Sequence, residues 1–328
     1  MLKIGVLGAG HLGKIHINCI KQIENYRLIG FYDQDKDTSE KVAADLAVKR
    51  FDDIDELIDS VDVVDIVTPT IAHFACASRA LKKGRHVFIE KPVVATVEQA
   101  NELIKLAREA DVKVQVGHVE RFNPAFTAAE PHIDRPLFVE GHRLAVFNPR
   151  GTDVPVVLDL MVHDIDIILH IIKSPIRHIS ASGVSIVSST PDIANARIEF
   201  ENGAVANLTA SRISMKNMRK HRIFQKDAYI TMDFLEKQTQ IVRINDSEGT
   251  PGPFDMTLTL ADGRTKKIAV EQLEIKQINA IQTELASFHD SIVNDTVPQV
   301  SIEDGVEVLR VAYMILDDMK RHQALLQN

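Results

Sequence analysis

The chain has 328 residues, of which 45% are hydrophobic and 26% charged, enough apolar material for two cores and unlike a disordered protein. Its formal charge is −8, from 38 Lys and Arg against 46 Asp and Glu. We therefore expect no nucleic-acid partner, because such binding depends on neutralising phosphates. With two cysteines, no long apolar run and no leader-like start, we expect no disulfide framework, no membrane contact and cytoplasmic residence.

The first 120 residues alternate strand and helix patterns. The strand patterns are rich in Val and Ile and nearly continuous in apolar residues, as in strands buried on both faces. They cover Lys3–Leu7, Leu28–Tyr32, Val61–Val67, His86–Ile89 and Val112–Val116, with helices over His11–Ile23, Lys36–Leu46, Ile54–Ser60, His73–Lys83 and Val97–Ala110. This alternation predicts an N-terminal α/β domain, residues 1–120, built as a Rossmann fold on a doubly wound parallel sheet.

The pattern changes over residues 121–328, which we expect to form a second, α+β domain. A strand-like run at Leu137–Val146 precedes a helix over Val156–Ile172. Strands without intervening helices follow, which favours a mostly antiparallel sheet, and Glu201-Asn202-Gly203 predicts a tight hairpin. These strands cover Ile176–Val187, Ala194–Phe200, Ala204–Ser211, Ala228–Phe234 and Gln238–Ile244, and the last helices Glu274–Val293 and Ile302–Leu325. Whether the C-terminal helix packs back on the first domain is left open.

A glycine-rich turn follows the first predicted strand. Residues 8–13 read Gly8-Ala9-Gly10-His11-Leu12-Gly13, the GxGxxG pattern, and open the first helix. Gly8 permits a tight turn, Gly10 lets the backbone approach a pyrophosphate, and Gly13 lets the helix pack close to the strand. The free N–H groups around His11 and Leu12 then face the phosphates. The sequence therefore predicts a dinucleotide site.

An acidic residue supports this prediction. Asp33 ends the second strand, 20 residues after Gly13, where a carboxylate can accept hydrogen bonds from the adenosine ribose. The next residue is Gln34, and the next basic one is Lys36. Because a carboxylate repels a 2′-phosphate, we expect NAD rather than NADP.

Several further motifs resemble the glucose–fructose oxidoreductase, inositol dehydrogenase and MocA family, called Gfo/Idh/MocA. Together with the glycine turn they span residues 1–235 in the family's order. They are Glu90-Lys91-Pro92, Thr68-Pro69 with His73, Gly117-His118 before Arg121-Phe122-Asn123-Pro124, the DxGxHxxD-like run Asp159 to Asp166, and the segment Ala194 to Ala204. Met161 stands where the family often has Gly, a change that we expect to narrow the pocket.

The resemblance implies a Rossmann domain followed by a domain with an open, mostly antiparallel sheet. It also implies pairing through that sheet, as a homodimer or homotetramer, and a Pro92 that follows a cis bond. For catalysis it implies Lys91, His163 and Asp159. His163 would be the general base for the substrate hydroxyl, Lys91 would stabilise charge on that oxygen or relay the proton, and Asp159 would orient His163 or bind a neighbouring hydroxyl.

The remaining site residues are expected from their positions. Polar residues at the carboxyl ends of parallel strands line ligand crevices, so we expect a set of them to line the nicotinamide half of the cofactor. This set comprises Thr68, Pro69, His73, Glu90, Lys91 and His118. Arg121 and Asn123, from the matched motif, and Arg150, from a loop before the catalytic helix, are candidate substrate contacts.

The helix Val156–Ile172 separates polar from apolar residues. Asp159, His163, Asp166 and His170 would share one face, and Leu158, Val162, Ile165 and Leu169 another that packs on the sheet. The polar face could be solvated surface or a catalytic stripe. It could also bind a metal, but we expect none, because there is no HExxH pattern and hydride transfer needs no metal when another cation handles the proton.

A basic segment, Arg212–Arg222, carries five Lys or Arg and also His221. It could be a solvated loop or strand edge, or the rim of a site for a phosphorylated or nucleotide-linked sugar. Residues 212–227 resemble members that oxidise the 3-hydroxyl of UDP-linked N-acetyl sugars.

The leading hypothesis is an oxidoreductase that transfers hydride between NAD and a hydroxyl carbon of a sugar, nucleotide-sugar or cyclitol. Two alternatives remain: a reductase of a non-sugar carbonyl or an imine, and a regulator that senses a dinucleotide without turnover. Assays with NAD and a panel of sugars would separate them.

Overall fold

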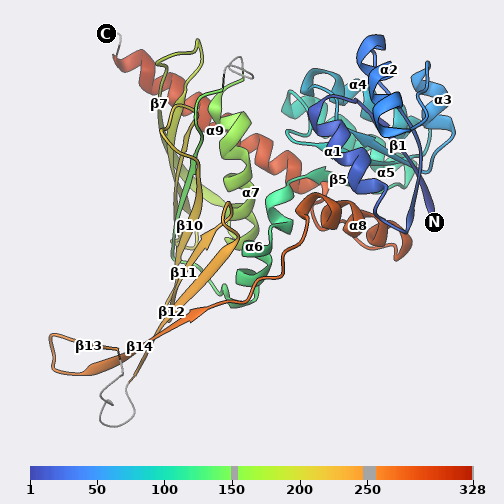
Figure 1. Cartoon of the computed structure of the whole chain (residues 1–328). Coiled ribbons are helices and arrows are strands. Elements are labelled where there is room, and N and C mark those ends of the chain that lie inside the picture. The colour runs from blue at the N-terminus through green and yellow to red at the C-terminus, as the bar shows by residue number, and fades with distance from the viewer. Residues whose placement is uncertain (149–153, 247–255, 327–328) are drawn as a thin grey trace. The chain divides into compact units, whose positions relative to one another are not determined.

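The computed structural model describes residues 1–148, 154–246 and 256–326. The chain divides into two compact units (Figure 1). The first comprises Met1–Phe122 and Asn279–Arg310, and the second Asn123–Ile278 and Val311–Asn328. Residues 279–310 therefore belong to the first unit, whereas the sequence placed them in the second domain. No described helix is long and apolar enough to cross a membrane.

The first unit is the expected Rossmann fold. Its five strands are all parallel and lie in the order β2-β1-β3-β4-β5, with helices in the connections. The strands are β1 (Leu2–Leu7), β2 (Tyr26–Tyr32), β3 (Val63–Ile66), β4 (His86–Glu90) and β5 (Val114–Gly117). The helices are α1 (His11–Ile20), α2 (Lys36–Leu46), α3 (Ile54–Asp59), α4 (Thr70–Lys82), α5 (Val97–Ala110), the 3-10 turn η1 (Val119–Phe122) and α8 (Ala280–Val293).

Local capping explains why α2 and α5 have the bounds that the sequence predicts. The Asp35 side chain accepts from the backbone N–H of Asp37 and Thr38 at the start of α2, and the Thr96 side chain accepts from Gln99 at the start of α5. Both helices end at a residue in the left-handed conformation, Ala47 and Asp111. These signals depend only on neighbouring residues.

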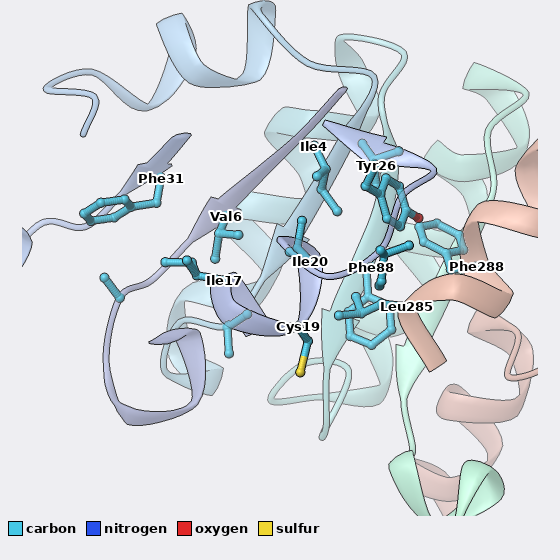
Figure 2. Packing of buried hydrophobic residues seen from close by; sticks show 14 of the residues in the cluster. Ile4, Val6, Ile17, Cys19, Ile20, Tyr26, Phe31, Phe88, Leu285 and Phe288 are labelled. Atoms are coloured by element: carbon cyan, nitrogen blue, oxygen red, sulfur yellow. The ribbon is translucent and has the colours of Figure 1, made fainter. Parts of the chain in front are cut away.

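The core of this unit includes side chains that are distant in sequence (Figure 2). Phe88 on β4 lies 6.1 Å, between ring centroids, from Phe288 on α8. Leu285, also on α8, is fully buried in the same cluster. The Gln115 side chain on β5 donates to the Glu284 carbonyl at 2.9 Å. Helix α8 is therefore part of the first unit's core.

The second unit contains a nine-stranded sheet in the order β13-β14-β12-β11-β10-β6-β9-β8-β7. Among its described strand pairs only β6 and β9 run parallel, so the expected mostly antiparallel sheet is confirmed. The strands are β6 (Phe138–Leu144), β7 (Ile176–Val184), β8 (Ile193–Phe200), β9 (Val205–Ser211), β10 (Met218–Phe224), β11 (Ala228–Asp233), β12 (Gln238–Asp246), β13 (Thr257–Thr259) and β14 (Thr265–Gln272).

Helices α6 (Pro124–Ala129) and α7 (Val162–Ile171) lie along one side of this sheet (Figure 1). A short 3-10 turn, η2 (Glu130–His132), follows α6, and a π-helical turn, η3 (Val157–Met161), precedes α7. The last helix, α9 (Ile302–Leu326), contributes residues to both units. The predicted hairpin is present, with Gly203 in the left-handed region at φ +86° between β8 and β9.

Candidate active site

A cavity of about 620 Å³ opens at the carboxyl ends of β1 and β3. These neighbouring strands are followed by connections to opposite sides of the strand order, which is where open α/β sheets bind ligands. From the predicted cofactor set, the walls include Gly8, Gly10, His11, Leu12, Asp33, Thr68 and Pro69. They also include Tyr32, Asp35, Thr38, Cys76 and Arg79, which the sequence did not single out.

The glycine turn has the geometry that a pyrophosphate requires. Gly8 has φ +97°, and a Cβ on Gly13 would lie 2.1 Å from the Gly8 carbonyl oxygen, so neither position accommodates a side chain. A Cβ on Gly10, by contrast, would meet no protein atom within 4 Å. Gly10 therefore borders open space, and no described side chain caps the helix that begins there. This cradle fits a phosphate group held by backbone N–H donors.

The Asp33 side chain is hydrogen-bonded to the glycine turn, residues 8–13. Its Oδ2 accepts from the Ala9 N–H at 2.6 Å, and its Oδ1 accepts from the Asp35 N–H at 2.9 Å. A carboxylate has about four acceptor positions, so two contacts leave capacity for ribose hydroxyls. Asp33 is therefore held at the cavity wall with acceptor positions left for ribose hydroxyls.

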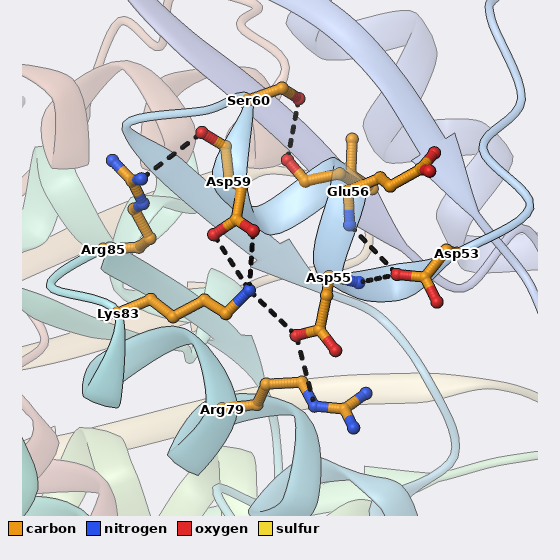
Figure 3. A network of polar contacts seen from close by, with 9 residues as sticks. Asp53, Asp55, Glu56, Asp59, Ser60, Arg79, Lys83 and Arg85 are labelled. Carbon is orange, nitrogen blue, oxygen red and sulfur yellow. Dashed lines mark hydrogen bonds and ion pairs between the residues drawn. The ribbon is translucent and has the colours of Figure 1, made fainter.

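The cavity also has a cation, Arg79, which comes from α4 (Figure 3). Its Nε lies 3.5 Å from Asp55 Oδ1 on α3. Lys83, just after α4, lies 3.0 Å from the same carboxylate and 2.8 Å from Asp59. The sequence considered only Lys36 as a basic neighbour of Asp33, because the approach of α4 to α3 is not visible in a local window.

A second group of predicted residues lies around the cis peptide bond between Lys91 and Pro92. Buried His73 has Nδ1 3.0 Å from the Pro92 carbonyl oxygen and Nε2 2.8 Å from that of Thr68. It therefore connects this turn to the loop after β3. Glu90 and His118 are buried, and Lys91 is half-buried.

Other members of the predicted cofactor set lie outside the wall of this cavity: Gly13, His73, Glu90, Lys91 and His118. That the last four line the nicotinamide half of the cofactor stays a prediction. Gly13 allows α1 to approach Gly8 closely. Both ring nitrogens of His73 lie within hydrogen-bond distance of backbone carbonyl oxygens. Glu90 instead contacts His16, on α1, which the sequence had not marked.

In the second unit the predicted catalytic helix is not one regular α-helix. The π-helical turn η3 holds Asp159, and α7 begins one residue before His163; both side chains are half-buried. A π-turn adds a residue to a helical turn, so the predicted helix is a π-turn followed by a regular α-helix that carries His163, Asp166 and His170. Asp166 is fully buried, while His170 pairs with Glu130, Nε2 to Oε1, at 2.6 Å.

The expected apolar face is also changed. Val162 and Ile165 are buried as predicted, but Leu158 and Leu169 are only half-buried. Met161, the departure from the family pattern, is fully buried at the end of η3.

A buried ion-pair cluster, unanticipated from sequence, holds α7 to the sheet. Arg143 on β6 donates to both Asp164 oxygens at 3.0 Å, and Asp164 Oδ1 lies 2.9 Å from His221 Nε2 on β10. The three residues are 3%, 2% and 0% exposed. Burial by itself raises the pKa of Asp164, but the charges and hydrogen bonds of Arg143 and His221 outweigh it and lower the pKa to about 2.

The basic segment Arg212–Arg222 is part loop and part strand: residues 215–217 form an exposed loop before β10. Arg212 is buried and donates to the Val154 carbonyl, and His221 belongs to the buried cluster. The last residues form β10, an interior strand of the sheet. On its other face, Lys220 pairs with Asp233 at 3.0 Å and Arg222 with Glu140 at 2.6 Å.

Comparison with known proteins identifies the family. Residues 2–118 match the model described as an oxidoreductase family with an NAD-binding Rossmann fold, and residues 131–231 match the GFO/IDH/MocA C-terminal domain. A UDP-N-acetylglucosamine 3-dehydrogenase of Acidithiobacillus ferrooxidans is 34% identical over 310 residues, 94% of this chain and 97% of the relative. The chain belongs to the Gfo/Idh/MocA oxidoreductases.

Other Gfo/Idh/MocA relatives include a scyllo-inositol 2-dehydrogenase (NAD(+)) of Bacillus subtilis, 29% identical over 234 residues, which cover 65% of this chain and 68% of the relative. A solved structure of the Acidithiobacillus ferrooxidans enzyme has a TM-score of 0.88 at 32% identity, with 98% of each chain covered. A scyllo-inositol dehydrogenase from Lactobacillus casei with bound NAD(H) and scyllo-inositol shares the fold, with a TM-score of 0.78 at 20% identity and 98% of each chain covered.

As a Gfo/Idh/MocA enzyme, the chain is an NAD-dependent oxidoreductase that acts on a CH–OH group, as the sequence predicted. When bound, NAD accepts or returns a hydride. The residues present fit this cofactor: the glycine cradle offers backbone donors and space for the pyrophosphate, and Asp33 offers acceptors for the ribose.

Two of the three predicted substrate contacts of this Gfo/Idh/MocA enzyme, Arg121 and Asn123, lie in the described part of the chain. Asn123 Oδ1 accepts from the Ala125 N–H at 3.0 Å, which caps α6, and its Nδ2 donates to the Phe234 carbonyl at 3.0 Å. These contacts give Asn123 a structural role, and its contact with substrate stays a prediction. Arg121 is buried in η1, and Arg150 lies outside the described residues.

Proposed function

We propose that this enzyme oxidises the 3-hydroxyl of UDP-N-acetylglucosamine, or of a closely similar UDP-N-acetyl sugar, to a ketone. The hydride leaves C3 for NAD and the hydroxyl proton leaves through the protein, giving the 3-keto sugar, NADH and a proton. The observation that carries the proposal is the 34% identity with UDP-N-acetylglucosamine 3-dehydrogenase across 94% of this chain and 97% of that one.

We assign the proton transfer to residues that match the family's motifs. His163 takes the hydroxyl proton, since an imidazole titrates near neutrality. Lys91 stabilises the negative charge that develops on the same oxygen, and Asp159 orients His163 or binds a neighbouring hydroxyl. Two observations support this: Asp159 and His163 are both half-buried, and Asp159 lies in a π-turn, a feature frequent at functional sites.

The decisive experiment follows NADH formation at 340 nm with a panel of alcohols. The panel includes UDP-N-acetylglucosamine, UDP-glucose, N-acetylglucosamine 1-phosphate, myo-inositol and scyllo-inositol. We expect the highest kcat/KM with UDP-N-acetylglucosamine and a product two mass units lighter. Reduction of that product with borodeuteride should place deuterium at C3.

Each alternative gives a different result in this assay. Preference for an inositol would replace the proposal with cyclitol oxidation, in line with the inositol dehydrogenase relatives. Oxidation of NADH with carbonyls or imines, but no oxidation of any alcohol, would indicate a reductase. Tight NAD binding with no turnover in either direction would indicate a regulator.

We further propose that the enzyme is a cytoplasmic homodimer or homotetramer that pairs through the second unit's sheet. The face opposite α6 and α7 carries aromatic side chains on neighbouring strands: the ring of Phe224 lies 5.8 Å from Phe138 and 4.8 Å from Tyr229. Phe224 is 40% exposed in the single chain. Light scattering after size exclusion should give two or four times the 36.6 kDa chain mass, and Phe224→Asp should shift it toward one chain. A monomeric wild-type protein would contradict this.

A further inference from the structure

Three ionisable side chains meet inside the first unit. His16 on α1, Asp65 on β3 and Glu90 at the end of β4 are 0%, 0% and 8% exposed. His16 Nδ1 lies 3.0 Å from Asp65 Oδ2, and His16 Nε2 lies 3.3 Å from Glu90 Oε1. The imidazole therefore bridges two carboxylates that come from neighbouring parallel strands.

The surroundings of these side chains are apolar. The His16 ring packs edge-on against Phe88, with centroids 5.8 Å apart, and Asp65 has Val6 and Phe88 as its partners on the adjacent strands. In such a site an isolated charge is strongly unfavourable, so ionised groups persist only in opposite pairs. Burial alone lowers the pKa of His16, but the charge and hydrogen bond of Asp65 and the charge of Glu90 outweigh it and hold the pKa well above its usual value.

This cluster contacts the backbone of Lys91 through Glu90. Glu90 Oε2 accepts from the Lys91 backbone N–H at 3.1 Å. A Cβ on Gly117 would lie 2.7 Å from Glu90 Oε1, so only a glycine at this position lets the carboxylate approach β5 so closely. Burial raises the pKa of Glu90, but the charges of His16 and Lys91 and the hydrogen bond from the Lys91 N–H outweigh it and leave the pKa below its usual value. Along Asp65, His16, Glu90 and Lys91 the charges therefore alternate in sign.

We propose that Asp65, His16 and Glu90 are positioning residues that set the charge state of the Lys91 amine. The inference deepens the proposed function, on which its catalytic meaning rests, because a lysine that stabilises or relays a proton depends on its own protonation. Glu90 favours the ammonium form of Lys91. His16, when protonated, offsets part of that effect, and Asp65 keeps His16 protonated.

Other titratable groups surround this chain of charges. Cys19 lies near His16, and Tyr26 near Asp65; burial raises the pKa of both groups, which keeps them neutral near pH 7. On the side of Lys91, His73 contacts the Pro92 carbonyl and His118 follows Gly117. None of these belongs to the alternating series, so substitutions within the series have predictable signs.

The test measures the pKa of the Lys91 amine in the full-length protein without substrate. Competitive labelling with acetic anhydride across pH, read by mass spectrometry, reports each lysine separately, and exposed Lys173 serves as the internal reference. His16→Gln removes a positive charge and should raise the Lys91 pKa by about half a unit or more; Asp65→Asn should act in the same direction. Glu90→Gln should lower it.

Opposite shifts for His16→Gln and Glu90→Gln support the proposal, because a merely structural defect would move both in one direction. An unchanged Lys91 pKa in all three folded variants overturns it. Should the variants fail to fold, a measurement on the wild-type protein still tests the proposal. Selective ¹⁵N labelling of histidine should show the His16 ring protonated at pH 8, and a neutral ring at that pH would overturn the proposal.

The outcomes separate this inference from the proposed function. If labelling shows the opposite shifts while Lys91→Ala keeps normal turnover, the charge coupling stands and the catalytic assignment of Lys91 falls. If Lys91→Ala abolishes turnover while the Lys91 pKa is unchanged in all three variants, the catalytic assignment of Lys91 stands and the charge coupling is refuted.

Discussion

The carboxylate of Asp33 and the backbone nitrogen of Ala9 lie 2.6 Å apart, which joins the end of β2 to the glycine turn after β1. The acid that we expect to bind the ribose and the turn that we expect to bind the pyrophosphate are therefore joined by a direct hydrogen bond. Changing the acid affects two properties at once, the charge of the cavity wall and the conformation of the turn.

Asp33→Asn removes the charge while its amide oxygen can still accept from Ala9; the hydrogen bond from the Asp35 N–H to the other oxygen is lost. We expect weaker NAD binding and stronger NADP binding. The ratio of kcat/KM with NADP to kcat/KM with NAD should rise about tenfold, which corresponds to about 1.4 kcal/mol. Calorimetric Kd values for both cofactors provide the measurement. Asp37→Asn removes a nearby exposed acid that is not part of the cavity wall and should leave the ratio unchanged.

The ion pair between Arg79 and Asp55 predicts a second change in cofactor preference. Asp55→Asn leaves Arg79 without this carboxylate at the cavity wall, so NADP should bind about threefold to tenfold more tightly, most clearly in the Asp33→Asn background. Asp59→Asn is the matched control: it removes a Lys83 partner from the same network and leaves the Arg79–Asp55 pair intact. Equal effects of the two variants would contradict this role of Arg79.

Gly10 and Gly13 should respond differently to the same added methyl group. Gly10→Ala places it in open space, so the protein without cofactor should keep its Tm while its NAD Kd rises at least about tenfold. Gly13→Ala places it 2.1 Å from the Gly8 carbonyl oxygen and should lower the Tm itself. Thermal melts with and without NAD distinguish the two. Unchanged NAD affinity in Gly10→Ala would refute the phosphate cradle.

Loss of the proposed proton-handling groups should affect turnover and spare cofactor binding. Lys91→Ala and His163→Ala should each lower kcat by about 100-fold or more, with NAD Kd unchanged, and Asp159→Asn should have a smaller effect. His178→Ala, an exposed histidine on β7, is the control and should retain full activity. Steady-state kinetics and NAD titration are the measurements. A near-normal kcat in both alanine variants would refute the assignment of Lys91 and His163 to proton transfer.

The buried cluster around Asp164 predicts a stability change. Asp164→Asn leaves Arg143 buried without its carboxylate and should cost about 3–5 kcal/mol in the free energy of unfolding. Asp233→Asn, which removes the carboxylate beside Lys220 on the half-exposed face of the sheet, should cost less than about 1 kcal/mol. Urea titrations at pH 7 compare them.

The same carboxylate gives a pH dependence with a defined sign. Its pKa is about 2 in the folded protein against an ordinary value of 3.8, so the unfolded chain binds this proton first. The stabilisation is complete above about pH 5 and is lost as the pH falls toward 2, amounting to about 2 kcal/mol. Wild type should lose this increment between pH 5 and 2, and Asp164→Asn should not. Parallel pH profiles would contradict the assignment.

Features that depend on neighbouring residues were predictable from the sequence. The Rossmann strands appear as apolar runs because they are buried on both faces, and the glycine turn appears because its steric demands lie within six residues. Helices α2 and α5 carry their own caps, so their bounds matched. β10 was missed because its sequence, MRKHRIF, has basic residues where a strand pattern expects apolar ones.

Only the tertiary structure could decide which polar groups are buried. His221, 57 residues from Asp164, and Asp65, 49 residues from His16, are accommodated in the protein interior because they form hydrogen bonds with those partners. The π-turn before α7 and the inclusion of α8 in the first unit likewise follow from packing. The sequence by itself determined the family, the Rossmann fold and the cofactor turn, because their signals are local. The charge clusters were decided by the fold, because desolvation and pairing depend on distances between segments that are remote along the chain.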